Sequence, residues 1–331
     1  MLIIVSLNSC LDKSLVISDF KVGSVCTGEL LRQTPAGKGV NVACILAALQ
    51  KEAVLQGFIG VGEEELFAKC LAHSSVSNHL TSLDFATRVN TTILDYKNNR
   101  ETHIRERGAE ISPKQLQKLQ ENLQTEIAKS TTNNKWIVFC GSLPPGISAA
   151  DFKALLISLK KSGVSIGVDI SGEALATALA AGVDLIKPNR DELLELISTL
   201  NLTKQNQTTD NDIAKNPLSM LELGQQIIAK YSNLQILASD GKAGAYYISA
   251  SQSWQAKYQA EVKVKNTVGA GDALLAGFLA SLMAENNLSS CLENGILTAT
   301  ASLSCIAAGE LDFNIIKAHE NKTEQILIRQ L

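Results

Sequence analysis

Short apolar runs alternate with amphipathic stretches along most of the chain. Five of the runs are rich in β-branched residues and have the length of buried strands, and the stretches between them repeat apolar residues near the helical period. This alternation predicts an α/β fold in which helices cover both faces of a mostly parallel sheet. The expected strands are 54–59, 136–140, 165–169, 184–187 and 234–239, and the expected helices are 40–49, 113–128, 151–161, 191–200 and 218–231.

Other segments depart from this rhythm. Residues 1–5 predict a buried first strand and have no basic segment ahead of them, so no secretory signal is expected. Segments 12–34 and 86–108 alternate β-type with charged residues and contain no long helix, which predicts a small second sheet. Residues 201–216 are rich in Asn, Gln, Thr and Asp and predict a solvated loop. The apolar run 273–284 is shorter than the ~20 residues that cross a bilayer, so we expect a buried helix and no membrane partner.

Composition narrows the function classes. The 30 Lys and Arg against 33 Asp and Glu leave a formal net charge of -3, which offers no basic field for a nucleic-acid partner. The length of 331 residues, 45% of them hydrophobic, permits a sizeable core in one large domain or in two ordinary ones. The seven cysteines include no C-x-x-C pair, so neither a disulfide framework nor a zinc site is predicted. Reduced thiols favour a cytoplasmic protein.

The clearest chemical pattern is N-T-V-G-A-G-D-A-L-L-A-G-F at 266–278. Gly269, Ala270 and Gly271 lead into an apolar helix, whose free backbone amides and dipole favour a bound phosphate. The two glycines have no Cβ to obstruct that phosphate. Asp272 lies in the first turn, where a carboxylate can take a proton from an attacking hydroxyl. As structure alone, the same carboxylate would complement the helix dipole.

Other catalytic motifs are missing from the sequence. No G-x-x-x-x-G-K-[ST] occurs, which excludes a P-loop, and the G-V-G at 60–62 lacks the third glycine of the dinucleotide fingerprint. The four histidines show no H-E-x-x-H spacing, and Gly141-Ser142 lacks the flanks of a hydrolase nucleophile elbow. Dehydrogenase, zinc-protease and serine-hydrolase interpretations therefore lose support.

Two further stretches are candidates for ligand contacts. P-A-G-K-G-V-N at 35–41 ends at the start of a helix, where the ammonium of Lys38 and the amide of Asn41 can hold an anionic, hydroxylated ligand; a flexible turn is the alternative. C-G-S-L-P-P-G at 140–146 offers the Ser142 hydroxyl at the carboxyl end of an expected strand, where ligands of parallel sheets bind. A structural Pro-Pro-Gly turn is the alternative there.

Taken in order, these stretches resemble the phosphofructokinase B branch of the ribokinase-like carbohydrate kinases over nearly the whole chain. S-L-N-S-C-L-D, ending at Asp12, is similar to the opening strand with the sugar-binding aspartate. A-G-K-G-V-N-V-A, with Gly37, is similar to the glycine-rich signature, and T-V-G-A-G-D to the catalytic signature. The resemblance implies one ribokinase-like domain over 1–331, a three-layer sandwich with a mostly parallel central sheet. It also implies that segments 12–34 and 86–108 form a small β-sheet lid over the sugar.

K-P-N-R-D-E-L at 187–193 resembles the family's N-x-x-E segment. The resemblance implies that Lys187 and Asn189 contact the nucleotide. It further implies that Asn189 and Glu192 position Mg²⁺ and phosphate. Without the other motifs this pattern would be uninformative, because N-x-x-E occurs on many surface helices.

A-S-D-G-K-A-G-A at 238–245 resembles the family's nucleotide-contacting turn. Two positions of the chain depart from the family pattern: Ser9 stands where proline is frequent, and Asp240 where an apolar residue is usual. The resemblance implies ATP contacts at Ser239, Gly241 and Gly244.

Basic residues of the expected lid bear on the substrate. Arg88, in T-R-V-N-T-T-I-L, resembles the arginine that grips a phosphate already on the sugar. Arg105 and Arg107 are two apart on a second expected strand, so the period of two would aim both at one face. A guanidinium matches phosphate geometry bidentately. A solvated lid edge is the alternative.

Lys38 inside the glycine signature resembles the pattern of 1-phosphofructokinases and tagatose-6-phosphate kinases more than that of 6-phosphofructokinases. We therefore expect a phosphorylated hexose as substrate, fructose 1-phosphate first, with tagatose 6-phosphate and fructose 6-phosphate as alternatives. A non-catalytic sensor of sugar phosphate or nucleotide is an alternative from another class, and a kinase for unphosphorylated ribose or nucleosides is disfavoured by the basic lid. An isolated lid sheet has edges and an apolar face to cover, which predicts a homodimer through the lids.

Overall fold

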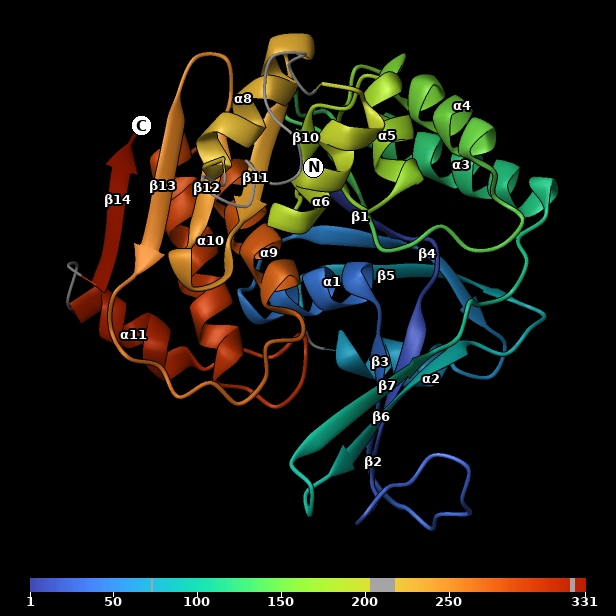
Figure 1. The fold of residues 1–331 in the computed structure, drawn as a ribbon. Helices are drawn as coiled ribbons and strands as arrows, with labels where there is room; N and C mark the ends of the chain where they lie inside the picture. The colour runs from blue at the N-terminus through green and yellow to red at the C-terminus, as the bar shows by residue number, and fades with distance from the viewer. Residues whose placement is uncertain (73, 203–217, 322–324) are drawn as a thin grey trace.

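The computed structural model describes residues 1–72, 74–202, 218–321 and 325–331. Within these ranges the strands form one sheet of ten and a separate sheet of four (Figure 1). The predicted loop 201–216 lies outside the described residues from 203 onward. No helix in the described ranges is long and apolar enough to span a bilayer.

The large sheet has the strand order β14-β13-β12-β11-β10-β9-β8-β1-β4-β5. Strands from β11 to β5 in this order run parallel, and β12, β13 and β14 extend one edge antiparallel. The expected run 184–187 shortens to two residues, and Pro188, which has no amide hydrogen, follows shortly after. The strands are β1 Leu2–Ser6, β4 Ala53–Gly60, β5 Val76–Leu83, β8 Trp136–Cys140, β9 Ser165–Asp169, β10 Leu185–Ile186, β11 Gln235–Ser239, β12 Ala245–Ile248, β13 Ser253–Tyr258 and β14 Ile326–Gln330.

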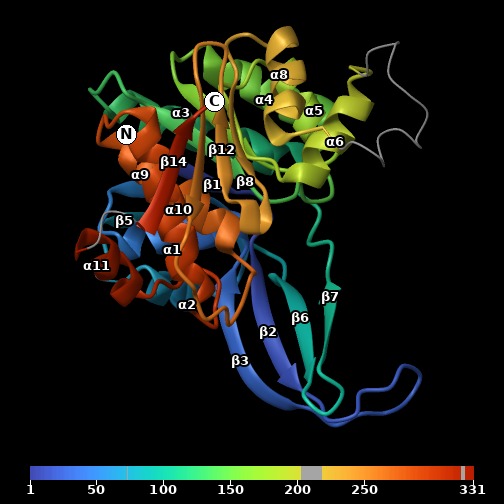
Figure 2. The same cartoon turned by 60° about the vertical axis from the view of Figure 1, so that its left-hand side comes forward.

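Helices cover both faces of the large sheet and complete three layers (Figures 1 and 2). Buried side chains of α3 to α6 and α8 form one core cluster, and those of α1, α2, α9 and α10 form the other. The predicted α/β sandwich is therefore confirmed. The helices are α1 Lys38–Ala48, α2 Glu64–Cys70, α3 Pro113–Lys129, α4 Ala149–Lys160, α5 Glu173–Ala180, α6 Arg190–Thr199, α8 Met220–Lys230, α9 Ala270–Met283, α10 Leu288–Leu303 and α11 Phe313–Asn321.

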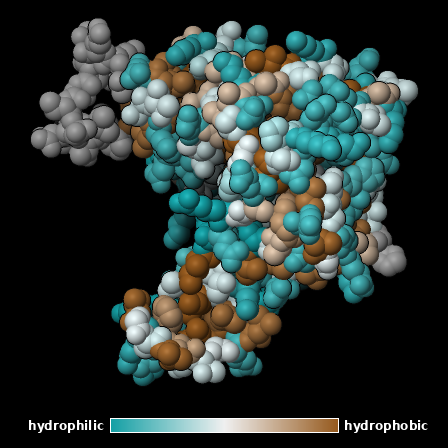
Figure 3. All heavy atoms as spheres, turned by 90° about the vertical axis from the view of Figure 1, so that its right-hand side faces the viewer, coloured by the Kyte–Doolittle hydropathy of each residue, from teal (hydrophilic) through white to brown (hydrophobic). Residues whose placement is uncertain are grey.

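The small sheet protrudes from the body of the molecule (Figures 1 and 2). Its order is β3-β2-β6-β7, and it is built from the two segments in which the sequence predicts a second sheet. Apolar residues gather on this part of the molecule (Figure 3). Exposed apolar residues here are Leu30, Leu31 and Ile104 on the strands, and Val22 and Val25 in the connection between β2 and β3. The strands are β2 Cys10–Val16, β3 Glu29–Ala36, β6 Arg88–Asp95 and β7 Arg100–Arg105.

Candidate active site

The carboxyl ends of neighbouring parallel strands meet at one edge of the large sheet. Ligands of open α/β sheets bind at this edge, because the loops that follow the strands diverge there. Five polar residues end or closely follow these strands: Ser6, Ser142, Asp169, Lys187 and Ser239.

Asp272 lies in the first turn of α9, as the sequence predicts. Gly269 caps the helix with a left-handed backbone, φ 87°, which glycine adopts without strain. Asp272 is 6% exposed, and its carboxylate accepts a 2.7 Å hydrogen bond from Asn41 Nδ2. Burial, and then the charge of Asp169, raise the pKa of Asp272 to about 7. A carboxylate with this pKa is suited to accept a proton near neutral pH.

Asp169 is fully buried between two lysines. Its Oδ1 accepts a 2.7 Å hydrogen bond from Lys38 Nζ, and its Oδ2 lies 3.4 Å from Lys187 Nζ. Burial alone would lower the pKa of Lys38, but the Asp169 carboxylate outweighs that effect and the pKa is raised. Lys38 is therefore held as a cation at the end of β9.

The start of α9 and the Lys187 ammonium form one corner that can accept an anion. A Cβ on Gly271 would lie 3.2 Å from Lys187 Nζ, so this ammonium stands directly beside the first turn of the helix. Backbone amides at a helix start favour negative charge, and a buried ammonium adds a full positive charge. The corner matches the charge that develops on a transferred phosphoryl group.

The glycine-rich signature brings α1 against β1. A Cβ on Gly39 would lie 2.7 Å from the Ser6 Cβ, so only glycine permits this approach. Gly37 has φ 110°, which turns the chain into the helix. This turn directs Lys38 toward Asp169 and Asn41 toward Asp272.

Asn189 and Glu192 are engaged with each other at the start of α6. Asn189 Oδ1 accepts from the Glu192 amide at 2.9 Å, and Glu192 Oε2 accepts from the Asn189 amide at 2.9 Å. No group of three or more metal-ligating side chains occurs in the described ranges of the chain. One carboxylate and one amide oxygen nevertheless fit Mg²⁺, which keeps several waters and binds largely through substrate phosphates.

The predicted nucleotide turn follows β11 as the short helix η1 Gly241–Ala243. Ser239 forms an isolated bridge with Asn189, so the turn lies beside the start of α6. A Cβ on Gly244 would lie 2.1 Å from the Ala256 carbonyl oxygen, whereas a Cβ on Gly241 would meet no atom within 4 Å. The turn is thus packed on one side and open at Gly241.

The small sheet aligns three predicted substrate residues. Asp12 on β2 is paired across the sheet with Asn90 on β6, and Asn90 with Arg105 on β7, so their side chains share one face. Arg88 is two residues before Asn90 and faces the same way. Asn90 Nδ2 donates to Asp12 Oδ1 at 3.1 Å.

The expectation that Arg107 shares a strand with Arg105 is wrong, because β7 ends at Arg105. The Glu106 carboxylate accepts a 2.8 Å hydrogen bond from the Val89 amide, and the backbone ladder between β6 and β7 ends there. The Glu106 carbonyl accepts from Arg88 at 3.0 Å. Arg88 also donates twice to the Asn8 carbonyl, at 2.8 and 3.1 Å.

Ser142 is exposed at the end of β8 and accepts a 3.1 Å hydrogen bond from Asn8 Nδ2. The same amide donates to the Arg107 carbonyl at 3.0 Å. Asn8 therefore joins the loop after β1, the C-G-S-L-P-P-G segment and the chain beyond β7.

Several residues of the site escaped the sequence analysis. Asp169 carried one usable signal, since it is the acidic last residue of a predicted buried strand. Asn8 lies inside S-L-N-S-C-L-D and Asn90 inside T-R-V-N-T-T-I-L, but no periodicity marks either residue.

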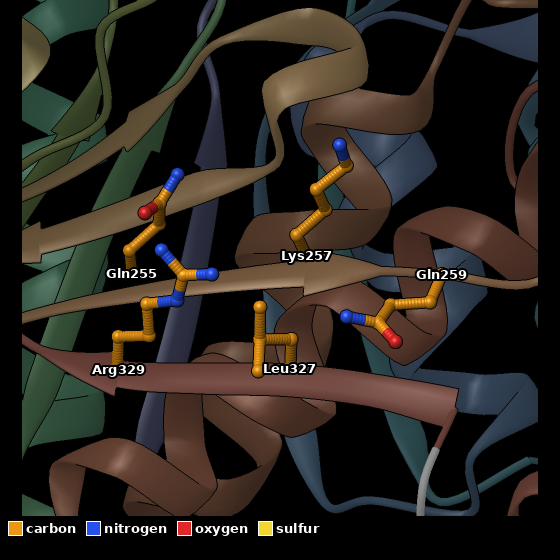
Figure 4. Close-up of a pocket in the computed structure, with 5 residues that line it drawn as sticks. All are labelled: Gln255, Lys257, Gln259, Leu327 and Arg329. Atoms are coloured by element: carbon orange, nitrogen blue, oxygen red, sulfur yellow. The ribbon is translucent and has the colours of Figure 1, made fainter.

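A hollow of about 520 Å³ lies elsewhere, over the face of β13 and β14 opposite α10 (Figure 4). It is near the sheet edge that β14 forms, away from the strand ends described above. Its lining residues are Gln255, Lys257, Gln259, Leu327 and Arg329. We do not assign it to the active site.

Comparison with known proteins identifies the family. Residues 5–313 match the pfkB family carbohydrate kinases. The 1-phosphofructokinase of Rhodobacter capsulatus is 30% identical over 276 residues, which cover 83% of this chain and 81% of that protein. Phosphofructokinase-2 from Escherichia coli, solved in complex with potassium, has a TM-score of 0.80 at 23% identity, covering 96% of this chain and 97% of that one. A possible 1-phosphofructokinase from Thermotoga maritima has a TM-score of 0.76 at 21% identity, covering 100% and 99%. The chain thus belongs to the pfkB family of carbohydrate kinases, enzymes that transfer a phosphoryl group to a sugar hydroxyl.

Proposed function

We propose that the protein is an ATP-dependent 1-phosphofructokinase that converts fructose 1-phosphate and ATP into fructose 1,6-bisphosphate and ADP. The observation that carries the chemistry is the buried Asp272 beside a phosphate-binding helix start and the Lys187 ammonium. The substrate choice draws support from relatives named 1-phosphofructokinase, which are 25% to 30% identical to the chain.

In the proposed reaction Asp272 takes the proton of the acceptor hydroxyl as its oxygen attacks the γ-phosphorus of ATP. A new oxygen–phosphorus bond forms, the bond from the γ-phosphorus to the bridging oxygen breaks, and ADP leaves with that electron pair. Asn41 orients the carboxylate. The amides of Gly269, Ala270 and Gly271, with Lys187, neutralise the charge on the transferred group.

The sugar phosphate is proposed to lie between the large and the small sheet. Asp12 binds sugar hydroxyls, while Arg88, Arg105 and Lys38 bind the phosphate already present. Two N–H groups of the Arg88 guanidinium remain after its three hydrogen bonds, enough for a bidentate phosphate contact. Gly37 and Ser142 complete the contacts from the loops.

Kinases of this family use ATP and a divalent metal ion. We propose that ATP extends from the turn with Ser239, Gly241 and Gly244 to Lys187 and Asn189. Asn189 and Glu192 would hold Mg²⁺ with the ATP phosphates. The ion, when bound, supplies positive charge to the phosphates that the protein groups alone do not fully neutralise.

We further propose that segments 12–34 and 86–108 act as a lid of the single domain 1–331 and that two chains pair through these lids. The exposed apolar side chains of the small sheet support this pairing. Phosphorylated hexose is the expected small-molecule partner. Seven free thiols, all in described parts of the chain, support a cytoplasmic location.

A panel of substrates tests the proposal. Purified protein is given ATP and Mg²⁺ with fructose 1-phosphate, fructose 6-phosphate, tagatose 6-phosphate, fructose or ribose, and ADP release is measured, with Asp272→Asn as the control. We expect the highest kcat/KM with fructose 1-phosphate. A higher value with another hexose phosphate would move the assignment to that sugar. Binding without turnover of any sugar would instead favour a sensor.

A further inference from the structure

The residue at which the nucleotide turn departs from the family pattern has a specific partner. Asp240 and Arg190 form a bidentate ion pair. Arg190 Nε donates to Asp240 Oδ1 at 3.0 Å, and Nη2 donates to Oδ2 at 2.8 Å. The third nitrogen, Nη1, donates a 2.9 Å hydrogen bond to the carbonyl of Leu218, two residues before α8 begins. All three guanidinium nitrogens are thus engaged in a fixed, planar arrangement.

This ion pair joins the two segments proposed to hold ATP. Arg190 directly follows Asn189, the cap of α6, and Asp240 directly follows Ser239 at the end of β11. The backbones of these segments meet at the Asn189–Ser239 bridge, where the Ser239 amide donates a 3.0 Å hydrogen bond to the Pro188 carbonyl. The side-chain pair adds a second, charged connection across the same junction.

The Asp240 backbone also makes the hydrogen bonds that close the turn. Its amide donates to the Gly244 carbonyl at 2.9 Å, and its carbonyl accepts from the Ala243 amide at 2.9 Å. The turn contains Gly241 and Gly244 at positive φ, and glycine restrains the backbone weakly. Holding the Asp240 side chain therefore sets the orientation of the whole turn relative to α6.

We propose that Arg190 and Asp240 are positioning residues that hold the nucleotide turn in register with the phosphate-binding segment of α6. The inference rests on the proposed ATP site at Ser239, Gly241 and Gly244. Neither side chain is assigned a contact with ATP. The pair acts through the geometry of the turn, and its loss weakens ATP binding while the sugar-phosphate contacts on the small sheet stay intact.

Steady-state kinetics of Arg190→Ala, Asp240→Ala and the double variant test the proposal. We expect each single variant to raise KM for ATP by about 5- to 30-fold, with KM for the sugar phosphate within about twofold of the parent. Because the two side chains act as one unit, the double variant should be no worse than the poorer single variant. Arg190→Lys, which keeps the charge but loses the fork, should fall in between.

Lys160→Ala is a matched control. Lys160 forms a comparable ion pair with Asp184, at 2.7 and 2.8 Å, but that pair joins α4 to the opposite end of β10. Its loss should lower Tm without changing KM for ATP. Calorimetric titration with ADP should repeat the pattern of KM without any turnover.

Two results would overturn the inference. One is an Asp240→Ala variant that keeps KM for ATP within about twofold of the parent, since Arg190 would then act without its partner. The other is a double variant whose effect is the product of the single effects. A further variant, Gly241→Asn, tests the proposed ATP site separately. Asn tolerates the positive φ at this position, and its side chain would occupy the open space in which ATP is proposed to bind. If Gly241→Asn leaves KM for ATP unchanged, the ATP site itself is wrong; if it raises KM while Asp240→Ala does not, only the positioning role fails.

Discussion

Asn41 Nδ2 donates a 2.7 Å hydrogen bond to the Asp272 carboxylate, joining the glycine-rich signature on α1 to the start of α9. Both residues are 6% exposed, so the bond is shielded from water and holds the carboxylate in one orientation. One carboxylate oxygen is thereby engaged. The segments that resemble the catalytic signature and the glycine-rich signature are therefore in direct contact through this pair.

Replacing Asp272 with Asn tests its role as the base. Asp272→Asn keeps the shape of the side chain but cannot take up a proton from the acceptor hydroxyl, so kcat should fall by about 10²- to 10⁴-fold. Initial rates at saturating substrates measure this, and circular dichroism checks the fold. Turnover above a tenth of the parent rate would contradict the assignment.

The raised pKa of Asp272 predicts an acid limb in the pH profile. Because the base must be deprotonated, kcat/KM should fall as pH drops below about 7, the pKa produced by burial and by Asp169. Asp169→Asn removes one of these causes and leaves Lys38 and Lys187 nearby, so the limb should move to lower pH. If kcat/KM fell at the same pH in the parent and in Asp169→Asn, a group other than Asp272 would be responsible for the acid limb.

The raised pKa of Asp272 also predicts how the stability of the fold changes with pH. The folded-state pKa of about 7 lies above the ordinary 3.8, so the folded protein binds more protons than the unfolded chain between these pH values. The contribution of Asp272 to stability is therefore present at low pH and lost as pH rises through 7. Asp272→Asn should be more stable than the parent at pH 8, and the difference should shrink toward pH 4, as urea denaturation at both pH values can measure.

Arg88 should act mainly through the sugar phosphate. A contact made equally in the ground and transition states affects KM, so Arg88→Ala should raise KM for the sugar phosphate by about 10- to 150-fold and leave KM for ATP nearly unchanged. Arg107→Ala is the matched control, because Arg107 is exposed and lies beyond β7. If both variants changed KM for the sugar phosphate equally, Arg88 would not be the residue that binds the phosphate.

The pairing of two small sheets predicts a mass of two chains by light scattering at micromolar protein. Val22 and Val25 are 94% and 102% exposed, so Val22→Asp with Val25→Asp should yield the mass of one chain. Ile157→Asp, at an exposed position of α4, is the control and should keep the mass of two chains. A single-chain mass for the parent would refute the dimer.

By itself the sequence determined the layered α/β fold, the second sheet and the start of α9. These features depend on local properties: hydrophobic periodicity selects helices and strands, and glycines before an apolar run mark a helix start that accepts an anion. The resemblance then connected Asp12, Lys38 and Asp272, which local patterns could not.

Only the tertiary structure decided which distant residues meet. Asp169 lies against Lys38, 131 positions away in the chain, and Asp240 against Arg190, 50 positions away. Such pairs depend on where the parallel strands end relative to one another, and periodicity within one strand carries no information about the side chains of the next. The ladder that ends at Arg105 has the same cause, since the Val89 amide is taken by a side chain from outside the strand.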